Sequence, residues 1–246
     1  MKTKKILHVP HASTFLPDFC RDSFPKEKLS HEIDVMTDWF CDELFEVEGE
    51  KLIFPVSRLF CDVERFREDE NEDMAKIGMG VCYRSCSDLS LLRQVPEQEK
   101  EFILREYYDK HHAALTALTE KALKESGGCL IFDYHSFFPT PLPYESDRSC
   151  HRPDFCIGVS DFHTPEGVKD CLFDLFLRRG YSVKINSPFA DSIVPMKFYR
   201  KDKRVASVMI EVNRSLYLSS PGRKNAAFSS LRSLLTEAME EAGEKI

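Results

Sequence analysis

Residues 128–136 read GCLIFDYHS, a short apolar run that ends in polar side chains capable of acid–base chemistry. Its length and its aliphatic and aromatic content are typical of a buried β-strand. Asp133 and His135 are two residues apart, so on a strand their side chains point to the same face. Asp133 is then placed either to orient His135 as a metal ligand or to pair with it in a buried site without metal.

Two other stretches of the chain end in the same way. Residues 5–14 read KILHVPHAST and bring His11 just past an apolar run, and residues 205–214 read VASVMIEVNR and bring Glu211 to the end of another. Ligand sites in open α/β sheets lie beyond the carboxyl ends of the strands. Two imidazoles and a carboxylate gathered there suit a hydrolytic metal site, so the pattern predicts an enzyme. A loop histidine bonded only to backbone is the alternative for His11.

Strand and helix signals alternate along the chain, which predicts an α/β fold with a largely parallel or mixed sheet. The expected strands are residues 4–10, 51–57, 128–134, 154–159, 181–186 and 205–212. The expected helices are residues 30–46, 96–126, 165–179 and 221–243. No repeat or linker composition divides the chain, so residues 1–246 are expected to form a single domain.

Composition excludes several classes of protein. The formal net charge of −7 argues against a nucleic-acid partner, because phosphate binding needs a basic face. No apolar run approaches the ~18 residues of a membrane span or forms a secretory signal, so no membrane association and a cytoplasmic location are expected. The nine cysteines include no CxxC pair, which argues against a disulfide framework or a structural zinc site.

A third metal ligand is expected from residues 30–46. Their helical pattern sets Asp34, Asp38 and Asp42 on one face at intervals of four residues. At least one of these carboxylates can then point at the sheet edge, although acidic residues on an amphipathic helix usually face water.

Glu211 lies in an otherwise apolar stretch, where a carboxylate is costly to bury without a partner. Two interpretations stay open: Glu211 moves protons at a metal site, or it forms an ion pair with Arg214 at the strand end. Arg58 and Arg65 follow the second expected strand, and a guanidinium group suits a substrate carboxylate. Pairing of Arg65 with neighbouring acids is the competing interpretation.

Taken together, the motifs resemble those of the N-formylglutamate amidohydrolase family from about residue 6 to residue 218. Residues 9–13 resemble its VPHSG-like motif, and residues 37–44 resemble its ED-x-x-VDEL helix, which favours Asp38 among the three aspartates. Residues 132–136 are similar to the family's IDxHS strand, and residues 209–214 to its QIEINR strand. These motifs occur in the order in which the family has them.

Other segments resemble the family with changes. Residues 57–65 are similar to its SR-x-x-x-D-x-NR motif, residues 110–112 to its PYH helix, and residues 186–189 to its NxPY segment without the following glycine pair. The departures lie near the expected substrate side, at Glu64, Lys110, Met209 and Ala190-Asp191. The chemistry of the family is therefore expected to transfer further than its substrate.

The resemblance implies a three-layer α/β/α fold of the zinc-exopeptidase, phosphorylase/hydrolase-like kind, around a mixed, mostly parallel sheet. It implies a divalent metal, zinc by expectation, and its ligands are implied to be His11, Asp38 and His135. Glu211 is then the general acid/base, and Asp133 lies behind a metal ligand. The residues implied to bind substrate are Arg58, Arg65, His112, Asn186 and Arg214.

The activity implied by the resemblance is hydrolysis of the amide of an N-acyl amino acid, such as N-formylglutamate, which is a small acidic molecule. One alternative is a zinc carboxypeptidase or an amidase that acts on a peptide-like substrate. Another is a binding protein that keeps the fold without turnover. His112 also has a simpler interpretation, because it lies on an apolar helical stripe where histidines are usually part of the core.

Overall fold

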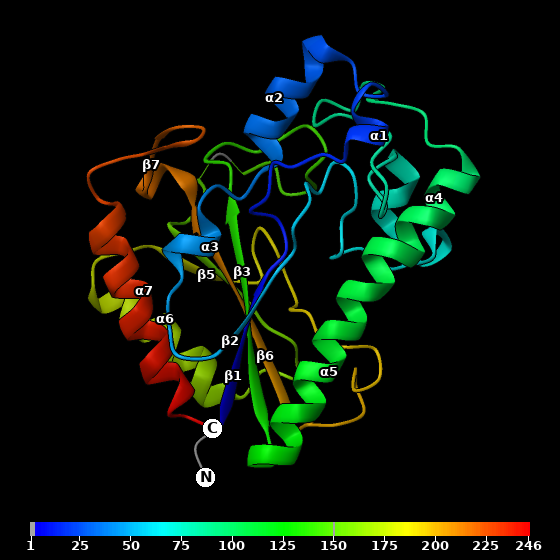
Figure 1. Cartoon of the computed structure of the whole chain (residues 1–246). Helices are drawn as coiled ribbons and strands as arrows, with labels where there is room; N and C mark the ends of the chain where they lie inside the picture. The colour runs from blue at the N-terminus through cyan, green and yellow to red at the C-terminus, as the bar shows by residue number, and fades with distance from the viewer. Residues whose placement is uncertain (1–2, 150) are drawn as a thin grey trace.

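The computed structural model describes residues 3–149 and 151–246, and a six-stranded sheet forms its centre (Figure 1). The strands of this sheet are β1 Lys4–Val9, β2 Glu50–Ile53, β3 Cys129–Phe137, β4 Phe155–Gly158, β5 Val183–Ile185 and β6 Val205–Asn213. Their order is β2-β1-β3-β6-β4-β5, and every neighbouring pair is parallel except β4 and β6. This confirms the predicted α/β fold with a mixed, mostly parallel sheet.

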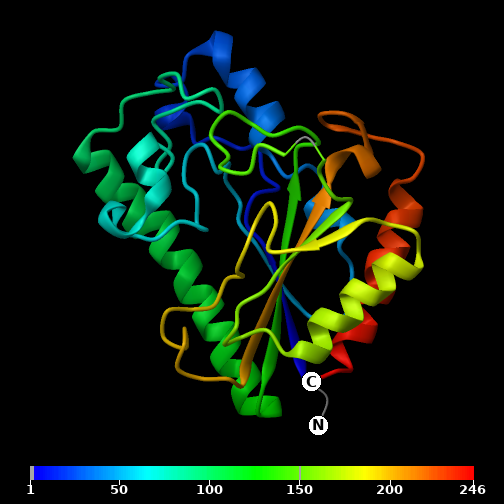
Figure 2. The ribbon, with the colours of Figure 1, turned by 180° about the vertical axis from the view of Figure 1, so that it is seen from behind.

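Helices cover both faces of the sheet. They are α1 Asp18–Arg21, α2 Lys26–Met36, α3 Cys41–Leu44, α4 Glu97–Ile103, α5 Asp109–Ser126, α6 Glu166–Arg178 and α7 Phe228–Gly243. Shorter helical turns are η1 Asp69–Asn71, η2 Asp73–Ile77, η3 Leu104–Tyr108 and η4 Arg214–Leu216. Figure 2 shows α6 and α7 together on one side of the sheet and α5 on the other, which gives the three layers.

The sheet face toward α6 and α7 is apolar. Phe132 and Tyr134 of β3 are fully buried there, because alternate residues of a strand point to the same face. Tyr134 stacks on Phe45, and Phe155 of β4 stacks on Phe176 of α6, with ring centroids 4.0 Å apart in both pairs. This face carries the main core of the protein.

The opposite face, toward α5, changes character along the strands. Near the strand starts, Ile131 packs with Leu115 of α5 in an apolar cluster. Toward the carboxyl ends of β3 and β6 the same face carries Asp133, His135, Met209 and Glu211. The acidic and imidazole side chains of β3 and β6 therefore belong to one face and one end of the sheet.

The structure differs from the predicted helix at residues 30–46. Helix α2 ends at Met36, and the chain breaks before the short helix α3, with Phe40 in the left-handed region at a φ of 60°. The backbone N–H of Asp38 donates to the carbonyl of His11 at 3.0 Å, which leaves helical geometry for a contact with the sheet edge. The prediction that three aspartates share one helical face is therefore wrong, and only Asp38 lies in the break.

The other helices agree with the predicted ones more closely. The expected helix 96–126 is formed by α4, the π-helical turn η3 and α5, and Gly127 ends it with a φ of +79°. The last helix begins at Phe228 rather than at residue 221, because the small hairpin of β7 Leu218–Ser220 and β8 Arg223–Lys224 precedes it.

The cysteines of the described residues are free thiols, and all but Cys171 are buried. Cys150 lies outside the described residues. Among the helices that the structure describes, none is long and apolar enough to cross a membrane.

Candidate active site

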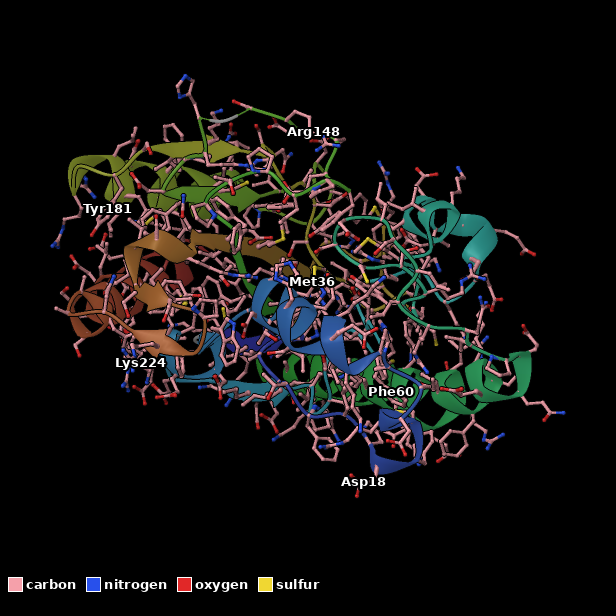
Figure 3. All side chains as sticks on the ribbon, turned by 90° about the horizontal axis from the view of Figure 1, so that it is seen from above. Asp18, Met36, Phe60, Arg148, Tyr181 and Lys224 are labelled. Atoms are coloured by element: carbon pink, nitrogen blue, oxygen red, sulfur yellow. The ribbon has the colours of Figure 1, made fainter. Side chains whose placement is uncertain are left out.

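Three segments that are distant in sequence meet beyond the carboxyl ends of β1 and β3. His11 follows β1 directly, His135 lies near the end of β3, and Asp38 comes from the break between α2 and α3. All three residues are buried. Figure 3 looks onto this end of the molecule, with Met36 of α2, which lines the cavity described below, near the centre of the view.

The facing atoms of these residues are close enough to share one cation. His11 Nδ1 lies 3.3 Å from His135 Nδ1, and Asp38 Oδ2 lies 3.2 Å from His135 Nδ1 and 3.6 Å from His11 Nδ1. The three ligand atoms all lie within 4.8 Å of one another. Ligand bonds of ~2 Å to a common ion are compatible with such spacing.

Each histidine is held from behind by a carboxylate. His11 Nε2 lies 2.8 Å from Asp62 Oδ1, and His135 Nε2 lies 3.1 Å from Asp133 Oδ1. In metal sites such outer carboxylates fix the tautomer and the orientation of the ligating ring. The donor set and its outer partners therefore fit a metal centre. Asp133 contacts His135, as the spacing of the two residues on the strand predicts. No local sequence pattern predicts the contact of Asp62 with His11.

The two buried aspartates closest to His11 are held in their charged form. Burial alone would raise the pKa of Asp38, but hydrogen bonds with the two histidines and the charge of Arg214 lower it. Arg214 donates to Asp38 Oδ1 at 2.8 Å, which leaves Oδ2 facing the histidines. Burial likewise opposes ionisation of Asp62, but Arg58, His11 and Arg65 together outweigh it and lower the pKa of Asp62.

Glu211 faces the same site without a partner. It is directly paired with His135 in the parallel register of β3 and β6, so both side chains point to the same face. Its Oε2 is buried and has no hydrogen-bond partner among the described residues. Burial, with a further contribution from Asp38, raises the pKa of Glu211 to about 8 against the opposing charges of His135 and Arg214. Such an orphaned buried carboxylate is a candidate for proton transfer.

Arg214 does not pair with Glu211. Its guanidinium donates to Asp38, to the hydroxyl and carbonyl of Ser136, and to the carbonyl of Val35. The ion-pair interpretation of Glu211 therefore loses its proposed partner. Arg214 holds the end of α2 and the carboxylate of Asp38 against the sheet.

A cavity of about 230 Å³ opens onto these residues. Arg58 and Arg65 line it and both lie close to Asp62, at 2.9 Å and 3.5 Å. Glu64, Glu145 and Glu211 also line the cavity, but the two guanidinium groups share one carboxylate and form one positively charged part of its wall. That wall suits an anionic substrate group.

Two of the expected substrate-binding residues lie elsewhere. The Asn186 side chain is bonded to the backbone N–H and carbonyl of Val159, and it does not line the cavity. His112 Nε2 lies 2.9 Å from the carbonyl of Val63 and faces a second cavity.

This second cavity of about 640 Å³ adjoins the first along the α5 face of the sheet. Glu64, Arg65, Ala190 and Met209 line both cavities and form the wall between them. Gly158 of β4 lies behind this wall. A Cβ at Gly158 would collide with Met209 and with the carbonyl of Asp191, so the close approach requires glycine.

Two solved structures share this fold. The N-formylglutamate amidohydrolase from Ralstonia eutropha JMP134 superposes with a TM-score of 0.83 and 23% identity, over 99% of this chain and 94% of that one. A gene product of Agrobacterium tumefaciens superposes with a TM-score of 0.69 and 17% identity, over 98% and 90% of the two chains. No curated protein matches the chain.

The sequence as a whole gives the family. Residues 3–218 match the N-formylglutamate amidohydrolase family, and this span contains His11, Asp38, His135 and Glu211. Most of the chain is covered by that match, and the chain therefore belongs to the N-formylglutamate amidohydrolase family.

Proposed function

We propose that this amidohydrolase is metal-dependent. Its proposed reaction is cleavage of the amide bond of an N-acyl amino acid that has an acidic side chain, such as N-formylglutamate. The observation that carries the proposal is the unpartnered Oε2 of Glu211, buried beside His11, Asp38 and His135. A carboxylate without a partner in that position has the chemistry of a general base.

His11, Asp38 and His135 are the proposed metal ligands. Two imidazoles and one carboxylate with an open fourth position form the donor set of many catalytic zinc sites, so zinc is the metal we propose. Such an ion supplies Lewis-acid chemistry, because it polarises a carbonyl and acidifies water.

Glu211 carries the proton in the proposed reaction. Its Oε2 has no hydrogen-bond partner among the described residues, so it would accept a proton from water and return it to the leaving amine nitrogen. In the register of β3 and β6 Glu211 is paired with His135, so the proposed base lies beside a proposed metal ligand on the same sheet face.

Arg58 and Arg65 are proposed to bind the substrate carboxylate. Both are partly buried beside Asp62, which holds their guanidinium groups in advance of binding. Substrate binding then costs little side-chain ordering, because these long side chains are already held.

A second candidate function is an amidase or carboxypeptidase activity on a peptide-like substrate. The adjoining cavity of about 640 Å³ favours it, because a formyl group alone has no need of that space. The same chemistry at His11, Asp38, His135 and Glu211 would serve both substrate classes.

The test is a substrate panel with zinc-loaded and chelator-treated protein. N-formylglutamate, N-acetylglutamate, longer N-acyl glutamates and short glutamyl peptides are compared by amine release. The proposal expects hydrolysis of N-acyl glutamates that zinc restores after chelation. Hydrolysis of peptides alone would favour the second candidate, and chelator-resistant or absent hydrolysis of every substrate would refute both.

A further inference from the structure

A second group of potential metal ligands lies on the same sheet face as the first. It is closer to the starts of the strands, two residues before His135 on β3. His8 of β1 is paired in register with Asp133 of β3, and Glu64 approaches from the loop after β2. His8 Nδ1, Glu64 Oε1 and Asp133 Oδ1 lie within 4.8 Å of one another. His8 and Asp133 are fully buried, and the Glu64 side chain is 17% exposed.

The group has more acceptors than donors. His8 Nδ1 lies 2.8 Å from Asp133 Oδ1 and 3.2 Å from Glu64 Oε1, and one N–H can be directed at only one of them. The shorter contact goes to Asp133, and Glu64 Oε1 is a buried oxygen with no hydrogen-bond partner among the described residues. An unpaired buried carboxylate oxygen is costly, so this oxygen favours a positive charge beside it.

The other nitrogen of His8 is held in the way that metal-bound imidazoles are held. His8 Nε2 lies 2.8 Å from His111 Nε2 of α5. A ligating histidine uses one ring nitrogen for the metal and the other for an outer partner. His111 is therefore placed as the outer partner of His8, in the same way that Asp62 is the outer partner of His11.

Two of the three side chains of this group border a cavity. Glu64 and Asp133 line the second cavity, which holds space for water and for entry of an ion. An entry path and free coordination positions are among the requirements for a functional metal site.

We propose that His8, Glu64 and Asp133 form a second binding site for a divalent transition-metal ion, separate from the one at His11, Asp38 and His135. A neutral imidazole and two carboxylates carry two negative charges, which match a divalent ion. The imidazole donor favours zinc or a related transition metal over calcium or magnesium.

The two sites are joined through Asp133. Its Oδ1 contacts both His8 Nδ1 and His135 Nε2, at 2.8 Å and 3.1 Å. An ion bound by Asp133 would change the charge behind His135, so filling the second site is expected to alter the affinity of the first.

The experiment measures zinc content and zinc position in the full chain. After chelation and reloading with zinc, wild type is expected to retain about two ions per chain, and H8Q and E64Q about one each. Anomalous diffraction at the zinc edge is expected to show a peak within ~2.3 Å of His8 Nδ1 and Glu64 Oε1. E68Q is the matched control, because Glu68 lines the same cavity but pairs with Arg67, and it should keep both ions.

Thermal unfolding and circular dichroism show whether the variants fold. If H8Q does not fold, the zinc content of E64Q alone tests the proposal. Equal zinc content in wild type and E64Q, or density with no anomalous peak beside His8, would overturn the proposal and leave a proton on His8 as the only occupant. Loss of the peak at His11 and His135 instead would count against the proposed function and not against this site.

Discussion

At the scale of single residues, the site depends on which buried polar atoms are satisfied and which are left free. Asp38, Asp62 and Asp133 each accept from a cation or a histidine, whereas Glu211 Oε2 accepts from nothing in the described protein. The satisfied carboxylates position other groups, and the unsatisfied one is available for chemistry. This contrast separates the roles of four acidic residues that look alike in the sequence.

Replacing Glu211 by Gln is expected to reduce turnover by ~10²–10⁴-fold, because the amide cannot accept a proton. Zinc content should stay unchanged, since Glu211 is not among the proposed ligands. Turnover with the preferred substrate and zinc per chain are measured side by side. Activity of E211Q close to that of wild type would remove Glu211 from the mechanism.

The same substitution should stabilise the metal-free protein at high pH. The pKa of Glu211 is raised from 4.5 to about 8, so its contribution to stability is fully present below pH 4.5 and is lost as the pH rises through 8. Gln stays neutral and avoids that loss. We expect a melting temperature for E211Q that is higher than that of wild type at pH 8.5, by at least ~2–4 °C, and a smaller difference at pH 5. Thermal scans in chelator at both values check the sign.

Replacing Asp62 by Asn should weaken metal binding and stability together. Asp62 accepts from Arg58 and Tyr83 and holds His11, so its loss leaves a buried guanidinium without its carboxylate. Loss of one partner of a buried pair costs about 3–5 kcal/mol, and loss of an outer ligand partner costs about 10–100-fold in metal affinity. Urea unfolding and competition with a chromogenic chelator measure the two effects. Wild-type zinc affinity in a folded D62N protein would contradict the role given to Asp62.

At the scale of elements, the strands could be predicted from the sequence and the break between α2 and α3 could not. Apolar runs such as residues 128–136 are decided by local composition, and β3 forms there. The spacing of Ile33, Met36, Phe40 and Leu44 is compatible with one helix, but it is equally satisfied by two pieces packed at different angles. The contacts that choose between them come from distant parts of the chain, which periodicity cannot detect.

The same limit applies to the candidate site. His11, His135 and Glu211 could be singled out because each ends an apolar run, and Asp38 was favoured only by the family resemblance. The contact of Asp62 with His11 spans 51 residues, and no local pattern encodes it. The motif SR-x-x-x-D was the one available signal for Asp62.

Arg214 is the side chain that fixes the α2–α3 break to the sheet. It donates to the Val35 carbonyl at the end of α2, to Asp38 in the break and to Ser136 on β3. R214K retains the charge but cannot reach these acceptors as a planar fork. We expect a loss of ~1–3 kcal/mol in the free energy of unfolding and a lower zinc content, both measured against K124R as an exposed control. Unchanged zinc content in R214K would show that Asp38 is positioned without it.

At the scale of the whole molecule, the sheet separates the main apolar core from the polar site. One face is an apolar core with stacked aromatic rings, and the other grades from apolar near the strand starts to polar at the carboxyl ends. Both cavities and both groups of potential metal ligands lie on the second face. Substitutions in the site therefore leave the main core intact.

The wall between the cavities should control substrate size. Met209 lines both cavities, and M209A removes most of its side chain. We expect the ratio of kcat/KM for a long N-acyl substrate over the formyl substrate to rise by about 10-fold, which corresponds to ~1.4 kcal/mol of added apolar contact. An unchanged ratio would mean that substrates do not cross this wall.

The position of the wall between the two cavities depends on Gly158, a residue that has no side chain. Any larger residue at position 158 must displace Met209 or the backbone at Asp191. It would shift the wall between the two cavities without replacing a polar side chain. Substitutions at position 158 can therefore change the preferred length of the acyl group and leave the proposed reaction unchanged. Libraries designed to shift the preferred acyl chain should therefore sample position 158 alongside the residues that touch substrate.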